Sequence, residues 1–450
     1  MEIQFLGATR TVTGSKYLLK TDKQVLIDCG LFQGIKELRL RNWQRFPIEP
    51  STIDAVVLTH AHLDHTGYLP LLVKNGFRGK IYCTQATQEI CKVLLLDSGH
   101  LQEEDAARAN RHGYSKHKPA LPLYTRADAE AVFPQLTVVP FHQDFSVGDL
   151  SFRYNHAGHI LGAACLLVKH NDTSILFTGD LGRANDPTII APEKIVAANY
   201  LVVESTYGDR LHGNVHPKEQ LGEIIKRTAK RGGTVIIPTF AVGRTQLVLY
   251  YIYQLLQENK IPKTPVFLDS PMAEEITEIM LKHKEEHSLS EEIYTAVSHV
   301  AHYVNTVEES KQLDISQFPK IIVAASGMLT GGRVLHHIKA LANDARNVIV
   351  FSGYQAVGTR GDALLHGHNV IKIYGELVTV NAEVVVLDNI SAHVDYQEMI
   401  DWLKNIPTPP RKVFITHGDL AAAESLQKKI NDALHWQCAV PDYLQVEQLR

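Results

Sequence analysis

Short apolar runs separated by turns dominate the first two hundred residues and predict strands. Nine such runs are predicted as strands, at residues 2–6, 16–19, 24–28, 54–58, 136–139, 150–154, 164–169, 174–177 and 200–204. Apolar positions at helical spacing occur over residues 68–75 and 85–97, and a polar helical stretch lies near 101–111. Two groups of strands with helices beside them predict a layered α/β sandwich.

From about residue 206 the pattern becomes a regular alternation of strand and helix. Strands are predicted at 234–238, 265–269, 320–324 and 348–351, and helices at 218–231, 244–259, 273–286 and 333–342. This alternation is typical of parallel βαβ units in a Rossmann-like domain. After residue 376 the predicted elements are strands at 383–388 and 411–416 and helices at 395–405 and 421–432. We therefore expect a discontinuous domain (1–205 and 376–450) and an inserted domain (206–375).

Composition and charge narrow the class of protein. The 450 residues are 45% apolar and 21% charged, which are ordinary globular values. The net charge of −4 argues against nucleic-acid binding by bulk positive charge. The apolar stretch from Leu247 to Leu256 is too short to cross a membrane, so we expect no membrane partner. Five scattered cysteines and the lack of a signal-like N-terminus favour a reduced, cytoplasmic protein.

The segment from Thr59 to His65 is the strongest chemical signal. It holds four metal-competent side chains within six residues, directly after a predicted strand: His60, His62, Asp64 and His65. Four such groups are too many for one catalytic site that also keeps an open position. The alternative is a polar loop whose histidines are satisfied by hydrogen bonds, but so many crowded groups would repel one another without a cation. The segment therefore favours two adjacent metal ions.

Two metal ions need further ligands, and other strand ends supply candidates. Asp28, His159, Asp180 and His417 each follow an apolar run and lie close to a glycine. A single strand-end Asp or His is more often a turn residue than a ligand, but four of them beside the histidine segment favour ligands. His156 competes with His159, and the spacing alone leaves the choice between them open.

These residues resemble a known family. The segment from His60 to His65 matches the H-x-H-x-D-H motif of the metallo-β-lactamase superfamily, with Asp28, His159 and Asp180 in the order of its other motifs. Glu204, His393 and His417 resemble motifs A, B and C of the β-CASP nucleases, the branch that includes ribonuclease J and the endonuclease of messenger-RNA 3′-end processing. The resemblance implies an αββα sandwich with an inserted Rossmann-like β-CASP domain, and it favours His159 over His156. The short sequence after His417 points to relatives without an extra C-terminal domain.

The resemblance also implies roles for the site residues. His60, His62 and His159 would hold one zinc, Asp64, His65 and His417 the other, and Asp180 would bridge them. Asp28 would orient a ligand imidazole by a hydrogen bond. His393 would be the general acid, with Glu204 holding it in position. Two Zn²⁺ ions per chain are expected, with Mn²⁺ as the alternative. Without the resemblance, a helix-capping or turn carboxylate is as good an interpretation of Glu204 as a catalytic role. The competing interpretation of His393 is a residue in the N-cap region of a helix.

Glycine-rich segments at strand ends of the insert are weaker signals. Each can present backbone N–H groups to a phosphate, although a plain tight turn is the competing interpretation. The residues assigned to substrate binding are Ser326, Gly327, Gly331, Arg333, Ser352, Tyr354, Arg360, Phe240 and Arg244. Within this set Phe240 is a candidate for stacking on a base, and Arg244 for pairing with a phosphate.

We conclude that the sequence predicts a zinc-dependent β-CASP ribonuclease that hydrolyses single-stranded RNA by a metal-activated hydroxide. The substrate is expected to thread between the domains; the endo- or exonuclease mode is left open, and a homodimer is one option for the assembly. A DNA-acting β-CASP nuclease is the first rival, against which the motif C histidine, His417, argues. A small-molecule hydrolase is the second, against which Glu204, His393 and the insert argue. An inactive binding subunit would be expected to have lost ligands.

Overall fold

The computed structural model describes residues 1–113, 115–194 and 197–450. The chain forms two compact units. Unit 1 contains Met1–Leu211 and His393–Arg450, and unit 2 contains His212–Ala392. No described helix has the length and hydropathy that crossing a membrane requires.

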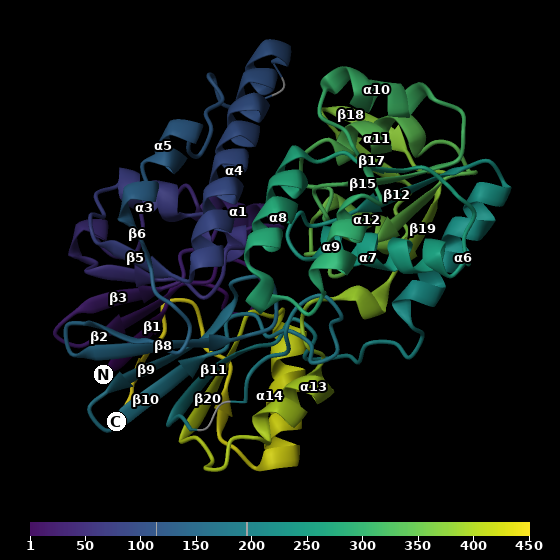
Figure 1. Cartoon of the computed structure of the whole chain (residues 1–450). Helices are drawn as coiled ribbons and strands as arrows, with labels where there is room; N and C mark the ends of the chain where they lie inside the picture. The colour runs from purple at the N-terminus through teal and green to yellow at the C-terminus, as the bar shows by residue number, and fades with distance from the viewer. Residues whose placement is uncertain (114, 195–196) are drawn as a thin grey trace. The chain divides into compact units, whose positions relative to one another are not determined.

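Two seven-stranded sheets make up the framework of unit 1 (Figure 1). The first has the order β22-β1-β2-β3-β4-β5-β6 and is parallel from β3 to β6. Its strands are β1 (Glu2–Phe5), β2 (Tyr17–Lys20), β3 (Gln24–Ile27), β4 (Ala55–Val57), β5 (Lys80–Cys83), β6 (Leu136–Val138) and β22 (Val446–Gln448).

The second sheet of unit 1 has the order β21-β20-β11-β10-β9-β8-β7. It is antiparallel from β7 to β10 and parallel from β10 to β21. Its strands are β7 (Asp144–Val147), β8 (Leu150–His156), β9 (Ala164–His170), β10 (Thr173–Phe177), β11 (Tyr200–Glu204), β20 (Lys412–Thr416) and β21 (Cys438–Ala439).

Apolar side chains from both sheets form one core. Phe5 of β1 lies against Phe414 of β20, with ring centroids 5.1 Å apart, and both are fully buried. Helices flank the sheets on opposite sides, with α3, α4 and α5 on one side and α13 and α14 on the other (Figure 1). The helices of unit 1 are α1 (Lys36–Arg41), α2 (Leu63–Thr66), α3 (Leu69–Lys74), α4 (Gln85–His112), α5 (Arg126–Glu130), α13 (Tyr396–Leu403) and α14 (Leu420–Leu434), with 3₁₀ turns η1 (Pro50–Thr52) and η2 (Phe133–Gln135).

Unit 2 is built on a six-stranded parallel sheet of order β14-β13-β15-β12-β16-β19. Its strands are β12 (Thr234–Pro238), β13 (Val266–Leu268), β14 (His302–Tyr303), β15 (Lys320–Ala324), β16 (Val348–Phe351) and β19 (Glu383–Val386), beside a hairpin of β17 (Val370–Ile373) and β18 (Glu376–Thr379). Its helices are α6 (Pro217–Lys230), α7 (Arg244–Gln257), α8 (Pro271–Lys282), α9 (Glu291–Ser298), α10 (Val307–Ile315), α11 (Val334–Leu341) and α12 (Arg360–Leu365), with 3₁₀ turns η3 (Lys284–Glu286) and η4 (Asp388–Ile390).

The observed boundaries differ from the expected ones. Strand β19 lies in the stretch 376–450 that the sequence assigns to the first domain, but it pairs in parallel with β16 and completes the sheet of unit 2. Unit 2 consequently runs to Ala392 rather than to residue 375. An apolar run of this length specifies a strand but not the sheet that it joins, because the pairing partner is distant in sequence.

Helix α4 is continuous where the sequence predicts two helical stretches. It passes through Gly99, at which an added Cβ would lie 2.9 Å from the backbone of Thr125 and Arg126. The glycine therefore permits close packing of the start of α5 instead of ending the helix.

Candidate metal centre and active site

The candidate ligands gather at the carboxyl ends of the strands of unit 1. Asp28 follows β3, and His60 comes shortly after β4, its parallel neighbour. In the second sheet Asp180 follows β10, Glu204 is the last residue of β11, and His417 follows β20. Parallel strands bring their carboxyl ends to the same edge, which places these side chains together. Asp28 (φ 57°) and His417 (φ 50°) adopt left-handed backbone conformations at these ends.

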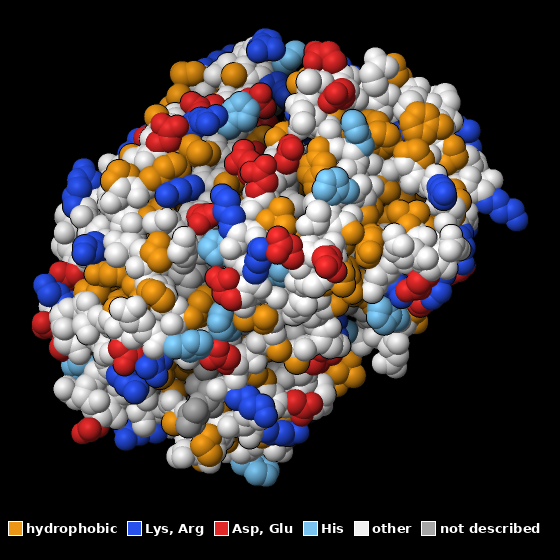
Figure 2. Space-filling model, viewed as in Figure 1, with side chains coloured by type: hydrophobic (Ala, Val, Ile, Leu, Met, Phe, Trp, Pro, Cys, Tyr) orange, Lys and Arg blue, Asp and Glu red, His pale blue; other side chains and the backbone are white. Residues whose placement is uncertain are grey.

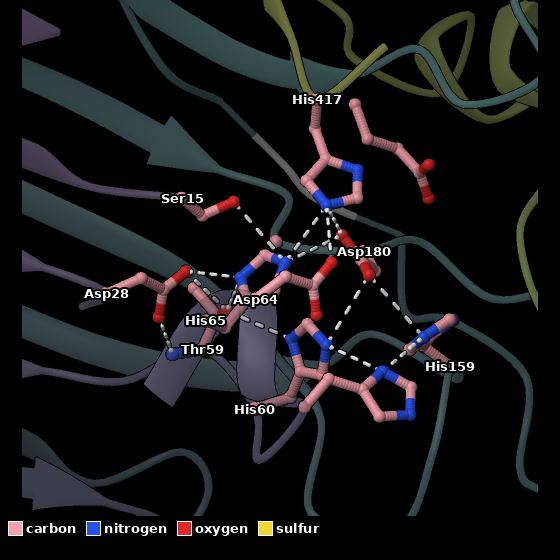
Figure 3. A network of polar contacts seen from close by, with 12 residues as sticks. Ser15, Asp28, Thr59, His60, Asp64, His65, His159, Asp180 and His417 are labelled. Carbon is pink, nitrogen blue, oxygen red and sulfur yellow. Dashed lines mark hydrogen bonds and ion pairs between the residues drawn. The ribbon is translucent and has the colours of Figure 1, made fainter. Parts of the chain in front are cut away.

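Four of the candidate ligands form a first group: His60, His62, His159 and Asp180. Figure 3 labels His60, His159 and Asp180 of this group. The Nδ1 atom of His62 lies 3.1 Å from His60 Nε2 and 3.2 Å from His159 Nε2. One carboxylate oxygen of Asp180, Oδ2, lies 3.4 Å from His60 Nε2 and 3.5 Å from His159 Nε2.

A second group contains Asp64, His65 and His417 (Figure 3). His417 Nε2 lies 3.2 Å from His65 Nε2 and 3.4 Å from Asp64 Oδ2. The other oxygen of Asp180, Oδ1, lies 3.2 Å from His65 Nε2 and 3.5 Å from His417 Nε2. Asp180 thus turns one oxygen toward each group.

These spacings fit metal ions. Ligand atoms at about 2.0–2.1 Å from a tetrahedral Zn²⁺ lie about 3.3–3.4 Å from one another, close to the 3.1–3.5 Å observed in both groups. Imidazole nitrogens at this distance from one another, in a buried site, are poorly stabilised by hydrogen bonds alone. Apart from its ion-pair contacts with His65 and His417, the buried Asp180 Oδ1 has no hydrogen-bond partner among the described residues. The donor set and its packing are therefore those of a divalent cation site.

The electrostatics of the groups leave most of these residues in their ligand forms. Burial, and after it the neighbouring His60, lowers the pKa of His62 to about 3. Burial and the neighbouring His393 hold the pKa of His159 well below its usual range. Burial would raise the pKa of Asp180, but the histidines around it, His417 first, outweigh burial and hold that pKa well below its usual range. Neutral imidazoles beside ionised carboxylates are the forms that bind a metal ion.

Asp28 contacts the second group through His65. Its Oδ2 lies 2.7 Å from His65 Nδ1, and its Oδ1 accepts a hydrogen bond of 2.7 Å from the backbone N–H of Thr59. The Thr59 hydroxyl also donates to Asp28 Oδ2, at 2.8 Å. Burial would lower the pKa of His65, but Asp180 and Asp28 raise it well above its usual range. Asp28 is thus placed to fix the orientation of the His65 ring, with Nε2 toward Asp180 and His417.

Glu204 and His393 form a pair beside the first group. Both carboxylate oxygens of Glu204 lie near His393 Nδ1, at 2.9 and 3.1 Å, and Glu204 Oε1 accepts a hydrogen bond of 2.6 Å from the Leu181 N–H. The ring of His393 lies 4.6 Å from that of His159, measured between centroids. The His393 side chain is 17% exposed and that of Glu204 only 1%, so the pair reaches solvent through the histidine.

The sequence does not predict two hydroxyl contacts with the candidate metal ligands. The Thr206 hydroxyl lies 3.2 Å from His417 Nδ1 and the Ser15 hydroxyl 3.4 Å from His65 Nε2. Thr206 is two residues after Glu204, so the strand-end rule could have found it, whereas nothing in the sequence near Ser15 indicates the contact. The structure also separates the two rival histidines, because His159 joins the first group and His156 lies beside Glu193 instead.

The predicted substrate-binding residues lie in unit 2, at the carboxyl edge of its sheet. The loops after β12, β15 and β16 meet there: Ser352 Oγ donates to the Pro238 carbonyl at 3.0 Å, and a Cβ on Gly327 would lie 2.8 Å from the Phe240 ring. Ser326 Oγ accepts hydrogen bonds from the N–H groups of Thr330 and Gly331. Tyr354 is half-buried.

Two arginines of this set, Arg333 and Arg360, contact protein oxygens, and the third, Arg244, is buried. Arg333 donates to Asp269 Oδ1 at 2.5 Å and to the Val304 carbonyl at 2.9 Å. Arg360 donates to the carbonyls of Lys372 and Leu329, at 2.6 and 2.8 Å, and Arg244 is 6% exposed. These side chains are therefore engaged in the fold of unit 2, which the sequence does not indicate.

Three family models match successive parts of the chain. They are the metallo-beta-lactamase superfamily over residues 12–209, the Beta-Casp domain over 245–364 and the Zn-dependent metallo-hydrolase RNA specificity domain over 377–441. The chain is 34% identical over 435 residues to Ribonuclease TTHA0252 of Thermus thermophilus, covering 93% of each protein. The chain belongs to the β-CASP ribonucleases. The expected metallo-β-lactamase fold with an inserted β-CASP domain is thereby confirmed, as is a metal-dependent nuclease.

Further β-CASP relatives agree with this placement. An RNase J-like protein of Methanocaldococcus jannaschii is 29% identical, with 93% of this chain and 92% of the relative covered. The Transcription termination factor FttA of Methanosarcina mazei is 33% identical over 96% of this chain and 69% of the relative. A crystal structure of a protein of unknown function from Enterococcus faecalis shares the fold, with a TM-score of 0.54 at 13% identity over 99% of both chains.

Proposed function

We propose that this β-CASP protein hydrolyses phosphodiester bonds of single-stranded RNA at a centre of two zinc ions in unit 1. His60, His62 and His159 would hold one ion, Asp64, His65 and His417 the other, and Asp180 would bridge the two. A set rich in imidazole suits zinc, and its carboxylates are compatible with manganese as the alternative.

The position of Asp180 is the observation that carries this proposal. Its two oxygens face the two ligand groups separately, at 3.4–3.5 Å from the nitrogens of one and 3.2–3.5 Å from those of the other. Two groups that share one carboxylate support two neighbouring ions rather than one ion with extra ligands. A bound pair of ions supplies an activated water nucleophile and offsets the charge on the phosphoryl oxygens.

The residues of the chain supply the proton for the leaving group. Glu204 contacts Nδ1 of His393, which favours a proton on that nitrogen and stabilises the doubly protonated ring. Nε2 is then the nitrogen that donates a proton to the departing 3′-oxygen. Because the His393 side chain keeps some exposure while Glu204 is buried, the histidine meets the substrate and the glutamate positions it.

The relatives support RNA as the substrate, and the surface charge indicates how the chain would bind it. The matched RNA specificity domain and the name of Ribonuclease TTHA0252 support RNA over DNA. Acidic and basic side chains are interspersed over the face shown in Figure 2, and the chain has a net charge of −4. Binding would therefore depend on a few well-placed phosphate contacts rather than on a broad basic surface.

The loops at the carboxyl edge of the unit 2 sheet are the proposed source of some of these contacts. The backbone of Gly331 and Gly353 borders open space, since a Cβ at either position would meet no atom within 4 Å. The N–H group of Gly353 can thus approach a phosphate closely, whereas that of Gly331 already donates to Ser326 Oγ. The half-buried Phe240 ring would stack on a base. Because Arg333 and Arg360 already bind protein oxygens, we assign more of the phosphate binding to the backbone of these loops than to the guanidinium groups.

Competition between substrates tests the proposal. The purified protein is given end-labelled single-stranded RNA, double-stranded RNA and single-stranded DNA of one sequence at several salt concentrations. We expect cleavage of single-stranded RNA to exceed that of both other substrates. The logarithm of the RNA-binding constant should fall with the logarithm of the salt concentration by about 0.7 per phosphate contact, and the total slope should correspond to only a few contacts. Equal cleavage of DNA and RNA, or a slope that implies eight or more contacts, would contradict it. Substrates with 5′-monophosphate, triphosphate or hydroxyl ends report the mode of cleavage.

Replacing His393 with alanine separates proton donation from metal binding. His393→Ala should keep its metal and its RNA affinity while cleaving about 10²–10⁴-fold more slowly, the usual contribution of a general acid. The control is His100→Ala, since His100 is an exposed histidine beside Glu104 on α4. Metal lost together with activity in His393→Ala would identify His393 as a ligand and refute its role as the acid.

A further inference from the structure

A second cluster of potential metal ligands lies in unit 1, outside the centre described above. It contains His142 from the turn between β6 and β7, His156 at the end of β8, and Glu193 from the segment that follows β10. Glu193 Oε1 lies 2.8 Å from His142 Nε2 and 3.9 Å from His156 Nε2. All three candidate ligand atoms lie within 4.8 Å of one another.

Backbone contacts hold these three segments together independently of the side chains. The His142 N–H donates to the Tyr154 carbonyl of β8, and the Glu193 N–H donates to the carbonyl of His156, both at 2.9 Å. The Trp402 indole N–H donates to the Glu193 carbonyl at 2.9 Å. The ring of His156 stacks on Phe141, with centroids 3.7 Å apart and planes 25° apart, which limits its orientation.

The donor set is that of a zinc-class site. Two imidazoles and one carboxylate suit borderline divalent ions such as Zn²⁺. The two nitrogen–oxygen distances, 2.8 and 3.9 Å, lie on either side of the separation of about 3.3–3.4 Å for ligands of one tetrahedral zinc ion, so small side-chain rotations would bring the three atoms onto one ion. Burial lowers the pKa of His156 despite the opposing effect of Glu193, which favours the neutral imidazole that binds metals.

We propose that His142, His156 and Glu193 form an additional binding site for a divalent ion of the zinc class, separate from the catalytic centre. The ion would link the segment that carries Glu193 to the end of β8, three residues before His159. Three protein ligands leave a fourth position for water, and the exposure of His142 (55% of its side chain) gives the ion access from solvent. This site is a structural addition to the proposed nuclease and does not depend on the number of ions in the centre.

Metal content at equilibrium tests the site. Wild type and His142→Asn are dialysed against a zinc buffer, and bound zinc per chain is measured. Asparagine tolerates the left-handed backbone of residue 142 (φ 64°), so the variant should fold. The matched control is His435→Asn, because His435 is also a histidine in that conformation (φ 58°) and lies outside both clusters.

We expect wild type and His435→Asn to bind one more equivalent of Zn²⁺ than His142→Asn, with nuclease activity unchanged in all three. Glu193→Gln should lose the same equivalent. When Co²⁺ is titrated instead of Zn²⁺, the absorption from one Co²⁺ site should be present in wild type and absent in His142→Asn and Glu193→Gln. Equal zinc content in wild type, His142→Asn and Glu193→Gln would overturn the proposal. So would a loss of the equivalent together with nuclease activity, since the metal would then belong to the catalytic centre.

Discussion

Units 1 and 2 each bury a cluster of histidine and aspartate, and the two clusters are stabilised differently. In unit 2, His337 lies between two carboxylates, with Nε2 at 2.9 Å from Asp269 and Nδ1 at 2.7 Å from Asp314. Asp269 also accepts from Arg333 and from the Ser310 hydroxyl. In unit 1, by contrast, ring nitrogens of His60, His62 and His159 lie only 3.1–3.2 Å apart.

The difference shows in the pKa values. Burial would lower the pKa of His337, but its hydrogen bonds to Asp269 and Asp314 raise it to about 9, so the cluster of unit 2 is complete as an ion-pair network. In the first ligand group of unit 1, burial instead lowers the pKa values of His60, His62 and His159. In the second group, Asp180 and Asp28 raise the pKa of His65, as Asp269 and Asp314 raise that of His337. A buried cluster that balances its own charge has a structural role. A cluster that packs neutral imidazoles against each other and against a carboxylate is organised around a cation that the chain does not itself supply.

The largest expected effect comes from Asp180→Asn. An amide cannot supply a negative oxygen to both ligand groups, so bound metal should fall and nuclease activity should drop to background. Metal analysis and cleavage of labelled RNA measure the two losses. The partner experiment is Asp269→Asn, which changes the same residue type in the other cluster and should leave metal content intact. Normal metal content in Asp180→Asn would refute the bridging role.

Asp269→Asn should instead destabilise the fold. It removes the shared carboxylate of His337 and Arg333, and breaking a buried ion pair in this way costs about 3–5 kcal/mol. Denaturant unfolding followed by a probe in unit 2 measures the loss. Asp344→Asn is the control: its ion pair with Arg346 is exposed, and solvent screening leaves such a pair with little effect on stability. Equal effects of the two substitutions would contradict the structural role of the cluster.

His337 should also make stability depend on pH. Its folded pKa of about 9 lies above the ordinary value of 6.5, so its contribution is complete below about pH 6.5 and is lost as the pH rises through 9. The full contribution is about 3 kcal/mol. The difference in unfolding free energy between wild type and His337→Gln should therefore shrink from pH 6 to pH 10. A constant difference would show that His337 is not charged in the folded protein.

The smallest expected effect concerns Asp28, whose hydrogen bonds reach the candidate metal centre through His65 and Thr59. Asp28→Asn should weaken metal binding about 10–100-fold, the usual effect of losing a carboxylate behind a ligand imidazole. Competition with a chelator measures this affinity. Asp54→Asn is a suitable control, since Asp54 is an exposed aspartate that pairs with Lys23. An unchanged affinity in Asp28→Asn would mean that Thr59 and packing alone orient His65.

Much of unit 1 could be predicted because its signals are local. The segment from His60 to His65 carries four ligand candidates in one stretch, and Asp28, Asp180 and His417 follow apolar runs that are strands in the structure. The remainder depends on contacts between residues that are distant in sequence. The pairing of β19 with β16 and the hydrogen bond from Arg333 to Asp269 have no local signal, so the end of unit 2 and the role of that arginine could not be predicted.

The metal positions themselves provide the most direct test of the central claim. A crystal of the zinc-loaded protein, measured with X-rays on both sides of the zinc absorption edge, shows where zinc binds. We predict two anomalous peaks about 3.5–4 Å apart, one near each oxygen of Asp180. One of them should be surrounded by His60, His62 and His159, and the other by Asp64, His65 and His417. A single peak, or no zinc between these side chains, would contradict the account.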